Sequence, residues 1–462
     1  MGLDANDSRS EKSTLRDHDM QSNGNPTGTA TEQTLNATTD DEKHDVEAPS
    51  QEPQKPAGGP PPPPNGGLVA WLHVLGGFML FFNTWGILNT FGIYQTYYET
   101  GSLFVENASN ISWIGAIQAY CVLLVGFLSG PIYDRGYFRS LLLVGSFGVV
   151  FGHMMLSVCH TYWQVLLAQG FCVGIGAGCL FVPCVAILPS YWSTKLGLAV
   201  GLAAAGSSMG GVIYPIVFYK LIDQVGFGWS TRIIGFIALA TLLIPNFVMK
   251  MRFKPPKARA LIDWTAFTDG QYMLAVVAAM IGFIGLYVIF FYISYYAEDT
   301  GITSSAMSFY IVPIFNAASV FGRTLPNALS DKTGAINLIA PGALAVGALQ
   351  FAMIGVKSEA ALIVVAILFG FFSGVFIALP PVLFVALTKD RTKIGTRIGM
   401  GFGILGFGVL AGGPGGGNLL GDGSNLHWTS LWVYAGVTGI VSGVLFIILR
   451  IWRGGPKLMV KV

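Results

Sequence analysis

The chain has 462 residues, of which 53% are hydrophobic and 11% are charged, and its mean hydropathy is +0.60. Soluble globular proteins carry about 25% charged residues, so this composition excludes an ordinary soluble protein and predicts a chain embedded in a lipid bilayer. The net charge of +2 hides an acidic beginning, because residues 1–56 hold twelve acidic and five basic residues while the rest holds twelve acidic and twenty-one basic ones.

The first 67 residues are predicted to form a disordered cytosolic tail. They are rich in Ser, Thr, Asn, Asp, Gln and Glu, and they end in GGPPPPPNGG. A segment with so few apolar residues cannot bury enough surface to offset the entropy of ordering it. We interpret Pro60 to Pro64 as a stiff polyproline II spacer, the alternative being a ligand for a proline-binding module.

Apolar runs separated by short polar breaks follow this tail, and each is long enough to cross a bilayer. They predict an all-α membrane protein whose twelve transmembrane helices form two six-helix bundles, residues 68–250 and 271–452. A linker at 251–270 joins the bundles, and a short tail at 453–462 follows them. The predicted spans are residues 69–95, 111–133, 140–159, 163–189, 196–220, 230–250, 271–297, 305–328, 335–356, 359–387, 395–419 and 428–452.

Lys and Arg residues gather on one side of this topology. Seventeen of them lie on the side of the N-terminal tail and three on the other side. Because cytosolic loops are enriched in Lys and Arg, we expect both termini and the linker to be cytosolic, in the plasma membrane. The sequons at Asn107 and Asn110 then lie in the first outer loop, where glycosylation is physically feasible, although a short loop can also escape it.

The two halves match each other in register. Asp134 follows the second span and Asp331 follows the eighth, 197 residues later. Gly178 in the fourth span and Gly374 in the tenth are 196 residues apart. The offset predicts a duplicated, pseudo-symmetric six-helix unit, which in membranes commonly means two bundles that rock about a site between them.

The chain offers no pattern for cofactor or covalent chemistry. The five cysteines lie in predicted spans without a CxxC motif, and the six histidines are scattered. GGPGGG near Pro414 lacks the following Lys-Ser/Thr of a phosphate-binding loop. We therefore expect no metal ion, no cofactor, no nucleic-acid partner and no enzymatic activity, and any transport would be facilitated or driven by an ion gradient.

Four motifs resemble those of one transporter family. They are NGGLVAW before the first span, YWSTKLGLAVGLAAAGSSMGG at the fifth, NAASVFGRTLPNALSDKTG at the eighth and GGPGGG at the eleventh. Together with DRGYFR after the second span, they resemble the fungal monocarboxylate transporter-like branch of the major facilitator superfamily. The resemblance covers about residue 65 to the end. It implies the major facilitator fold and a secondary transporter that works by alternating access.

Arg323 is a cation inside an otherwise apolar predicted span. An unpaired guanidinium in hydrocarbon costs at least ~2.5–3.5 kcal/mol, so a compensating role is expected. Either it snorkels or pairs with a residue such as Asp331, or it faces a water-filled cavity and holds a carboxylate or other planar anion.

The resemblance implies the second role for Arg323, since the family has an arginine in this helix that meets the substrate carboxylate. Two positions depart from the better-known animal members. Ser319 stands where they carry an aspartate, and Asn89 stands where they carry a lysine linked to proton-coupled binding. Proton coupling therefore stays open, but not through that lysine.

Five further residues are candidates for the substrate site: Trp85, Asn89, Gln118, Tyr287 and Asn316. Trp85 and Asn89 share a helical face, and Trp85 serves either the cavity or packing. Gln118 and Asn316 form either interhelical hydrogen bonds or ligand contacts. A single arginine among aromatic residues suits a partly hydrophobic monoanion.

Asp134, Arg135, Asp331 and Lys332 are predicted to act as a conformational latch between the two halves. The alternative is that they only determine topology. The overall prediction is a non-ATP transporter of a small organic carboxylate or carboxylated metabolite, including export of a secondary metabolite. A riboflavin-type uptake carrier and a non-transporting nutrient receptor are the alternatives.

Overall fold

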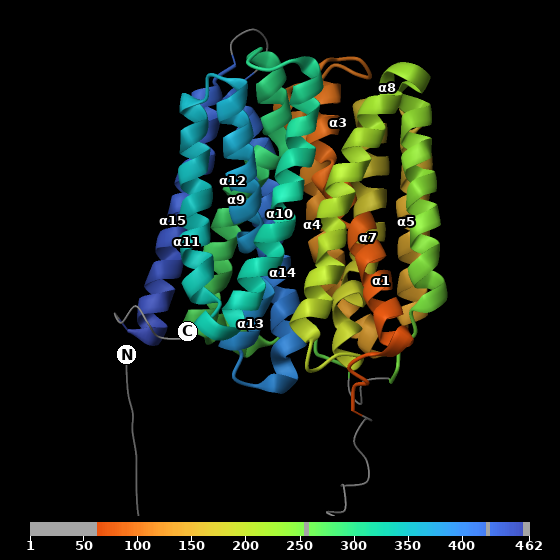
Figure 1. The fold of residues 1–462 in the computed structure, drawn as a ribbon, viewed down its shortest axis with the longest axis vertical. Coiled ribbons are helices and arrows are strands. Elements are labelled where there is room, and N and C mark those ends of the chain that lie inside the picture. Colours follow the sequence, from red (N-terminus) through yellow and green to blue (C-terminus); the bar gives the residue numbers. More distant parts are fainter. Residues whose placement is uncertain (1–61, 254–257, 422–425, 456–462) are drawn as a thin grey trace, which may run out of the picture. The chain divides into compact units, whose positions relative to one another are not determined.

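The computed structural model describes residues 62–253, 258–421 and 426–455, without the side chains of Asp331 and Arg391. Throughout this part of the chain the regular secondary structure is helical (Figure 1). The predicted disordered tail, up to residue 61, and residues 456–462 of the predicted C-terminal tail lie outside the described residues.

The first half begins with α1 (Gly67–Asn83), α2 (Trp85–Asn89), α3 (Phe91–Glu99), α4 (Ala108–Asp134), α5 (Phe138–Leu156), α6 (Tyr162–Val165), η1 (Leu166–Val173), α7 (Gly174–Ala186) and η2 (Leu188–Ser190). Helices α1 to α3 form one bent span. Thr84 and Thr90 mark its two bends, and each hydroxyl donates to a carbonyl four residues earlier, at 2.9 Å. Such back-bonding threonines often bend helices.

Helix α8 (Leu196–Val248) comes next and is 53 residues long. The linker contains η3 (Trp264–Thr268). The second half consists of α9 (Gly270–Asp299), α10 (Ser305–Thr333), α11 (Ile336–Ala352), η4 (Met353–Gly355), α12 (Glu359–Ala378), α13 (Pro380–Leu387), η5 (Arg391–Lys393), α14 (Ile394–Leu420) and α15 (Trp428–Gly454).

Gly226 divides α8 into two membrane spans. A continuous helix of 53 residues would be about 80 Å long, far more than the ~30 Å of a bilayer core. Gly226 has φ 72° and ψ 174°, a conformation that is essentially restricted to glycine. The described residues contain eleven helical stretches long and apolar enough to cross a membrane. With α8 counted twice, they supply the twelve predicted spans.

The duplicated unit is visible in how two glycines pack. A Cβ on Gly178 of α7 would lie 2.6 Å from Val125 of α4, and a Cβ on Gly374 of α12 would lie 2.7 Å from the Ser319 carbonyl of α10. In both halves, therefore, the fourth span approaches the second through a glycine too crowded to carry a side chain. Close approach through small residues is the usual way for membrane helices to associate.

Two helix pairs form most of the contact between the halves, which we call the seam: α4 with α14, and α8 with α10 (Figure 1). We call the end of the bundle that carries the linker the linker end, and the opposite end the far end. At the far end, Ser109 donates to the Pro414 carbonyl at 3.0 Å. Toward the linker end, the rings of Phe181 and Phe402 lie 5.7 Å apart. The halves are therefore in contact toward both ends of the seam.

The positive φ of Gly226 leads to a stability prediction. Gly226→Ala should destabilise the protein by about 1–3 kcal/mol, because alanine is strained in this conformation although no atom obstructs its Cβ. The matched control is Gly201→Ala, where the space is equally open and φ is not positive, so alanine should be neutral or stabilising. Thermal unfolding of the purified variants measures both. Equal melting temperatures for the two variants would contradict the strain argument.

Candidate functional site

Helix α10 carries a polar stripe at the seam. Asn316, Ser319 and Arg323 are three and four residues apart, so they share one helical face. All three are buried. A Cβ on Gly211 of α8 would lie 2.6 Å from Asn316, which shows that this face approaches α8 closely.

Three hydrogen bonds from this stripe cross the seam. Arg323 Nη1 donates to Ser207 Oγ of α8 at 2.6 Å, and the hydroxyls of Ser319 and Ser208 are 2.8 Å apart. Asn89 Nδ2 of α2 donates to Asn316 Oδ1 at 3.1 Å. The structure thus brings together three sequence-predicted positions: Arg323, Asn316 and Asn89.

The Arg323 guanidinium is only partly satisfied. The residue is 4% exposed, and its Nε and Nη2 have no hydrogen-bond partner among the described residues. None of the ion pairs that the described residues form includes Arg323. Its head lies buried at the seam rather than exposed at a membrane surface. Two donors on one edge of the cation are therefore available to a ligand.

The other predicted site residues occupy different surroundings. Tyr287 is close enough to Arg323 for an electrostatic interaction. Trp85 meets Phe181 edge to face with ring centroids 5.7 Å apart, so it packs against an aromatic side chain. Gln118 is fully buried and neither its Oε1 nor its Nε2 has a hydrogen-bond partner among the described residues. Gln118 lies on α4 of the first half and Arg323 on α10 of the second half.

A second polar cluster lies at the linker end, and we call it the linker clamp: Asp134, Arg259, Asp263, Asp269, Lys393 and Arg397. Arg259 of the linker grips Asp134 at the end of α4 through Nε (2.6 Å) and Nη2 (2.8 Å). Asp263 pairs with Lys393 and Arg397, both at 3.0 Å, and Asp269 pairs with Arg397 at 2.8 Å. The linker is thus fixed to both halves.

The predicted latch residues take part unequally in this cluster. Asp134 is buried and paired, whereas Arg135 and Lys332 are exposed. The Asp331 side chain lies outside the described part of the chain. The linker is a basic stretch in sequence, and its carboxylates Asp263 and Asp269 were missed, because their partners Lys393 and Arg397 lie 128 to 134 residues farther along the chain.

Both predicted glycosylation sites lie at the start of α4. Asn107 caps the helix, since its Oδ1 accepts the Asn110 backbone N–H at 2.7 Å. The Asn110 side chain donates to Glu106 at 2.8 Å. The capping bond uses Oδ1 of Asn107 and leaves its Nδ2, the atom that carries a glycan, outside the cap.

The linker clamp sets the protonation of Asp263. Burial acts to raise the pKa of this carboxyl, but hydrogen bonds from Thr265, Arg397 and Lys393 outweigh it and hold the pKa well below its usual range. Asp263 is therefore ionised throughout the neutral range, as its ion pairs require.

Comparison with known proteins identifies the fold family. The Major Facilitator Superfamily model matches residues 73–359. The chain belongs to the major facilitator superfamily. It is accordingly a membrane-embedded secondary transporter of a small molecule.

Its relatives include fungal transporters of this superfamily. The MFS-type transporter dbaD of Emericella nidulans is 66% identical over 384 residues, which cover 83% of this chain and 86% of the relative. The aspyridones efflux protein apdF of the same organism is 34% identical over 380 residues, covering 82% and 76%. A mutant of the nucleoside transporter NupG has a similar crystal structure, with a TM-score of 0.64 over 82% of this chain and 99% of that chain; at 13% identity it shows the fold alone.

The depressed pKa of Asp263 predicts a pH window for its contribution. Asp263→Asn should lower the melting temperature of this superfamily member at pH 7. A carboxylate with a depressed pKa stabilises the fold above its unfolded pKa of ~3.9 and loses that effect as pH falls toward its folded value. The difference between parent and variant should thus stay constant from pH 7 to about 5 and shrink below about 4.

Asp223→Asn is the control, since Asp223 is exposed. Its melting temperature should follow the parent at every pH. If the parent and Asp263→Asn have the same melting temperature at pH 7, or if their difference persists unchanged to pH 3, the clamp does not depend on the ionised carboxylate.

Proposed function

We propose that this transporter carries an organic monoanion, a carboxylate or another planar anion, which binds Arg323 at the seam. The observation that carries the proposal is the pair of buried, unpartnered donors on Arg323, Nε and Nη2. A cation with unmatched donors away from water is unfavourable. A planar anion offers two acceptor oxygens at the spacing of this edge, and its charge offsets that of the guanidinium.

The same chain contains a filled example of this arrangement. Arg259 holds the two Asp134 oxygens with the same two atoms, Nε and Nη2, at 2.6 and 2.8 Å. The Arg323 guanidinium differs because its bond to Ser207 uses Nη1, which leaves the edge formed by Nε and Nη2 open. Ser207 thus orients the fork, and the substrate takes the place that Asp134 takes at Arg259.

The seam bonds are suited to alternating access. The Ser208–Ser319 and Asn89–Asn316 bonds join neutral groups, and such bonds contribute only about 0.5–1.5 kcal/mol each. They hold the halves together without preventing separation. An anion that binds Arg323 would compete with none of them, because it uses donors that they leave unoccupied.

The proposal also covers the orientation of the protein in the membrane and the direction of transport. The excess of Lys and Arg at the linker end supports a cytosolic linker and cytosolic termini in a plasma-membrane protein. Export of a secondary metabolite is supported by a relative named as an efflux protein. The far end is then extracellular, with Asn107 and Asn110 accessible for glycosylation. The monocarboxylate transporter-like branch remains our assignment from the sequence motifs.

The anion site predicts opposite effects of Arg323→Gln on transport and on stability. Exchange of labelled carboxylates in proteoliposomes should fall at least ~100-fold, since two charge-assisted hydrogen bonds of about 1.5–3 kcal/mol each are lost. The melting temperature of the substrate-free protein should stay level or rise, because an incompletely satisfied buried charge is removed. Arg323→Lys should be intermediate, because it keeps the charge and loses the fork.

Arg232→Gln is the matched control, because Arg232 interacts with Trp229 and Ser157 and lies near the start of the sixth span, away from the seam contacts of Arg323. It should transport like the parent. If Arg323→Gln transports normally, or loses transport together with a large drop in melting temperature, Arg323 is a structural residue and the proposed anion site fails.

The linker clamp is proposed to act as the latch that closes the linker end. Asp134→Asn should change the maximal exchange rate by about tenfold and leave the KM within about twofold, because the pair affects conformational change and does not touch the substrate. Proteoliposome exchange over a range of substrate concentrations separates the two parameters. A change confined to KM would contradict the latch.

A double-mutant cycle tests the partner assignment. Asp134→Asn combined with Arg259→Gln should have nearly the same rate as either single variant, since all three break one ion pair. Additive effects would show that Asp134 and Arg259 act separately.

A further inference from the structure

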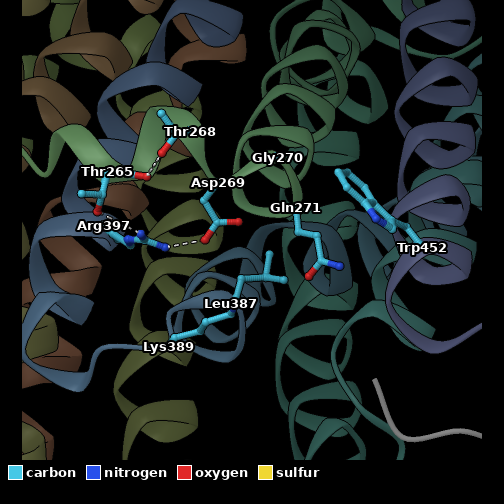
Figure 2. A pocket seen from close by; sticks show the side chains of 9 residues that line it. All are labelled: Thr265, Thr268, Asp269, Gly270, Gln271, Leu387, Lys389, Arg397 and Trp452. Atoms are coloured by element: carbon cyan, nitrogen blue, oxygen red, sulfur yellow. Dashed lines mark hydrogen bonds and ion pairs between the residues drawn. The ribbon is translucent and has the colours of Figure 1, made fainter.

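A cleft of about 450 Å³ opens at the linker end of the second half (Figure 2). None of the residues that line it belongs to α10, which carries the polar stripe. Its volume lies within the ~300–1,000 Å³ of typical small-molecule sites. The start of α9, the segment after α13, the start of α14 and the end of α15 all contribute to it. The lining residues are Thr265, Thr268, Asp269, Gly270, Gln271, Leu387, Lys389, Arg397 and Trp452.

The lining of the cleft carries net positive charge. Its one carboxylate among the described residues, Asp269, is paired with Arg397 (Figure 2). Lys389 is exposed and makes no hydrogen bond or ion pair with a described residue. A third cation, Arg453, donates to the lining residue Gln271 at 3.4 Å. The cleft thus offers the unpaired ammonium of Lys389, with the guanidinium of Arg453 at its edge.

Exposed aromatic residues flank this positive lining. Trp452 is 58% exposed, and its ring lies close to Gly270, where an added Cβ would be 2.8 Å away. On the linker, Trp264 is 73% exposed, and its ring centroid is 5.9 Å from that of Phe267. Because the cleft lies where spans end, these rings are at the level of the membrane surface, the region that Trp prefers.

We propose that this cleft binds the phosphate headgroup of an anionic phospholipid. Lys389 and Arg453 meet the headgroup charge, the Thr265 and Thr268 side chains line the polar part, and Trp452 lies against the glycerol and acyl region. Basic pockets between membrane helices are known to suit such headgroups, and anionic lipids are concentrated in the cytosolic leaflet, where we place the linker end. A lipid also accounts for the aromatic rim, which a soluble phosphate would leave in water.

The position of Arg397 connects this site to the linker clamp. Arg397 lines the cleft and holds both Asp263 and Asp269. A headgroup that fills the cleft packs against the side of this ion-pair network and restricts its motion. Occupancy should therefore stabilise the closed linker end and raise the melting temperature of the protein.

The first experiment measures lipid retention by native mass spectrometry of the full chain in detergent. Phosphatidylserine and phosphatidylcholine are added at equal concentration to the parent, Lys389→Gln and Lys195→Gln. Lys195 is the matched control, because it is also an exposed lysine near the start of a span at the linker end. The parent and Lys195→Gln should retain phosphatidylserine in preference to phosphatidylcholine. Lys389→Gln should retain about fivefold less phosphatidylserine than the parent, which is the effect of one cation near an anionic surface.

A second measurement locates the lipid. Brominated phosphatidylserine should quench the tryptophan fluorescence of the parent more than that of Trp452→Phe, because Trp452 lies in the cleft. Inorganic phosphate at the same concentration should neither raise the melting temperature nor displace the lipid.

Three results would overturn the proposal: equal retention of the two lipids, equal loss of retention in Lys389→Gln and Lys195→Gln, or a thermal shift that inorganic phosphate reproduces. The last result would assign the cleft to a soluble phosphate. Because Lys389 and Trp452 lie apart from Arg323, failure here leaves the anion transport proposal untouched, and loss of anion exchange in Arg323→Gln does not test the lipid site.

Discussion

A buried guanidinium with an unfilled edge constrains how the two halves of this transporter meet. Moving a charge away from water carries a penalty of several kcal/mol, and only well-placed partners compensate for it. At the seam Arg323 finds Ser207 for one nitrogen and no partner among the described residues for two others. Helices α8 and α10 therefore pack closely, but the charge of Arg323 between them is not fully compensated.

Small residues make this arrangement geometrically feasible. Gly211 gives Asn316 room against α8, and Gly374 lets α12 approach the backbone of Arg323, where an added Cβ would lie 3.0 Å from its nitrogen. Close helix approach fixes the direction of the polar stripe, because the stripe cannot rotate without a clash. The guanidinium is thus held in place by packing before any substrate arrives.

The centre of the seam and the linker end use different kinds of interaction. At the centre, single hydrogen bonds join the halves: two between neutral groups, Ser208–Ser319 and Asn89–Asn316, and one from the Arg323 guanidinium to Ser207. At the linker end, charged pairs fix the linker, with Asp134 gripped by two nitrogens of Arg259. Neutral bonds are individually weak, whereas charge-assisted bidentate pairs are about twice as strong. This division suits a protein whose centre must open to a substrate and whose linker must keep the halves in register.

The sequence by itself determined the helical membrane architecture, because apolar runs of spanning length can satisfy their backbone groups in a bilayer only as helices or closed barrels, and their lengths fit helices. It also determined the duplication, through repeats such as Gly178 and Gly374, and it singled out Arg323, because a lone cation in an apolar run is costly.

Only the tertiary structure decided which partners these residues have. Asp134 pairs with Arg259, 125 residues away, and Arg323 bonds to Ser207, 116 residues away. Serines and alternating linker charges give no signal of such pairing in sequence, since their partners are set by how the helices pack. The break of α8 at Gly226 lay within a predicted loop, but its conformation depends on the backbone path that joins two packed spans. The local sequence pattern therefore determined the helices, whereas long-range packing determined the hydrogen bonds and ion pairs between them.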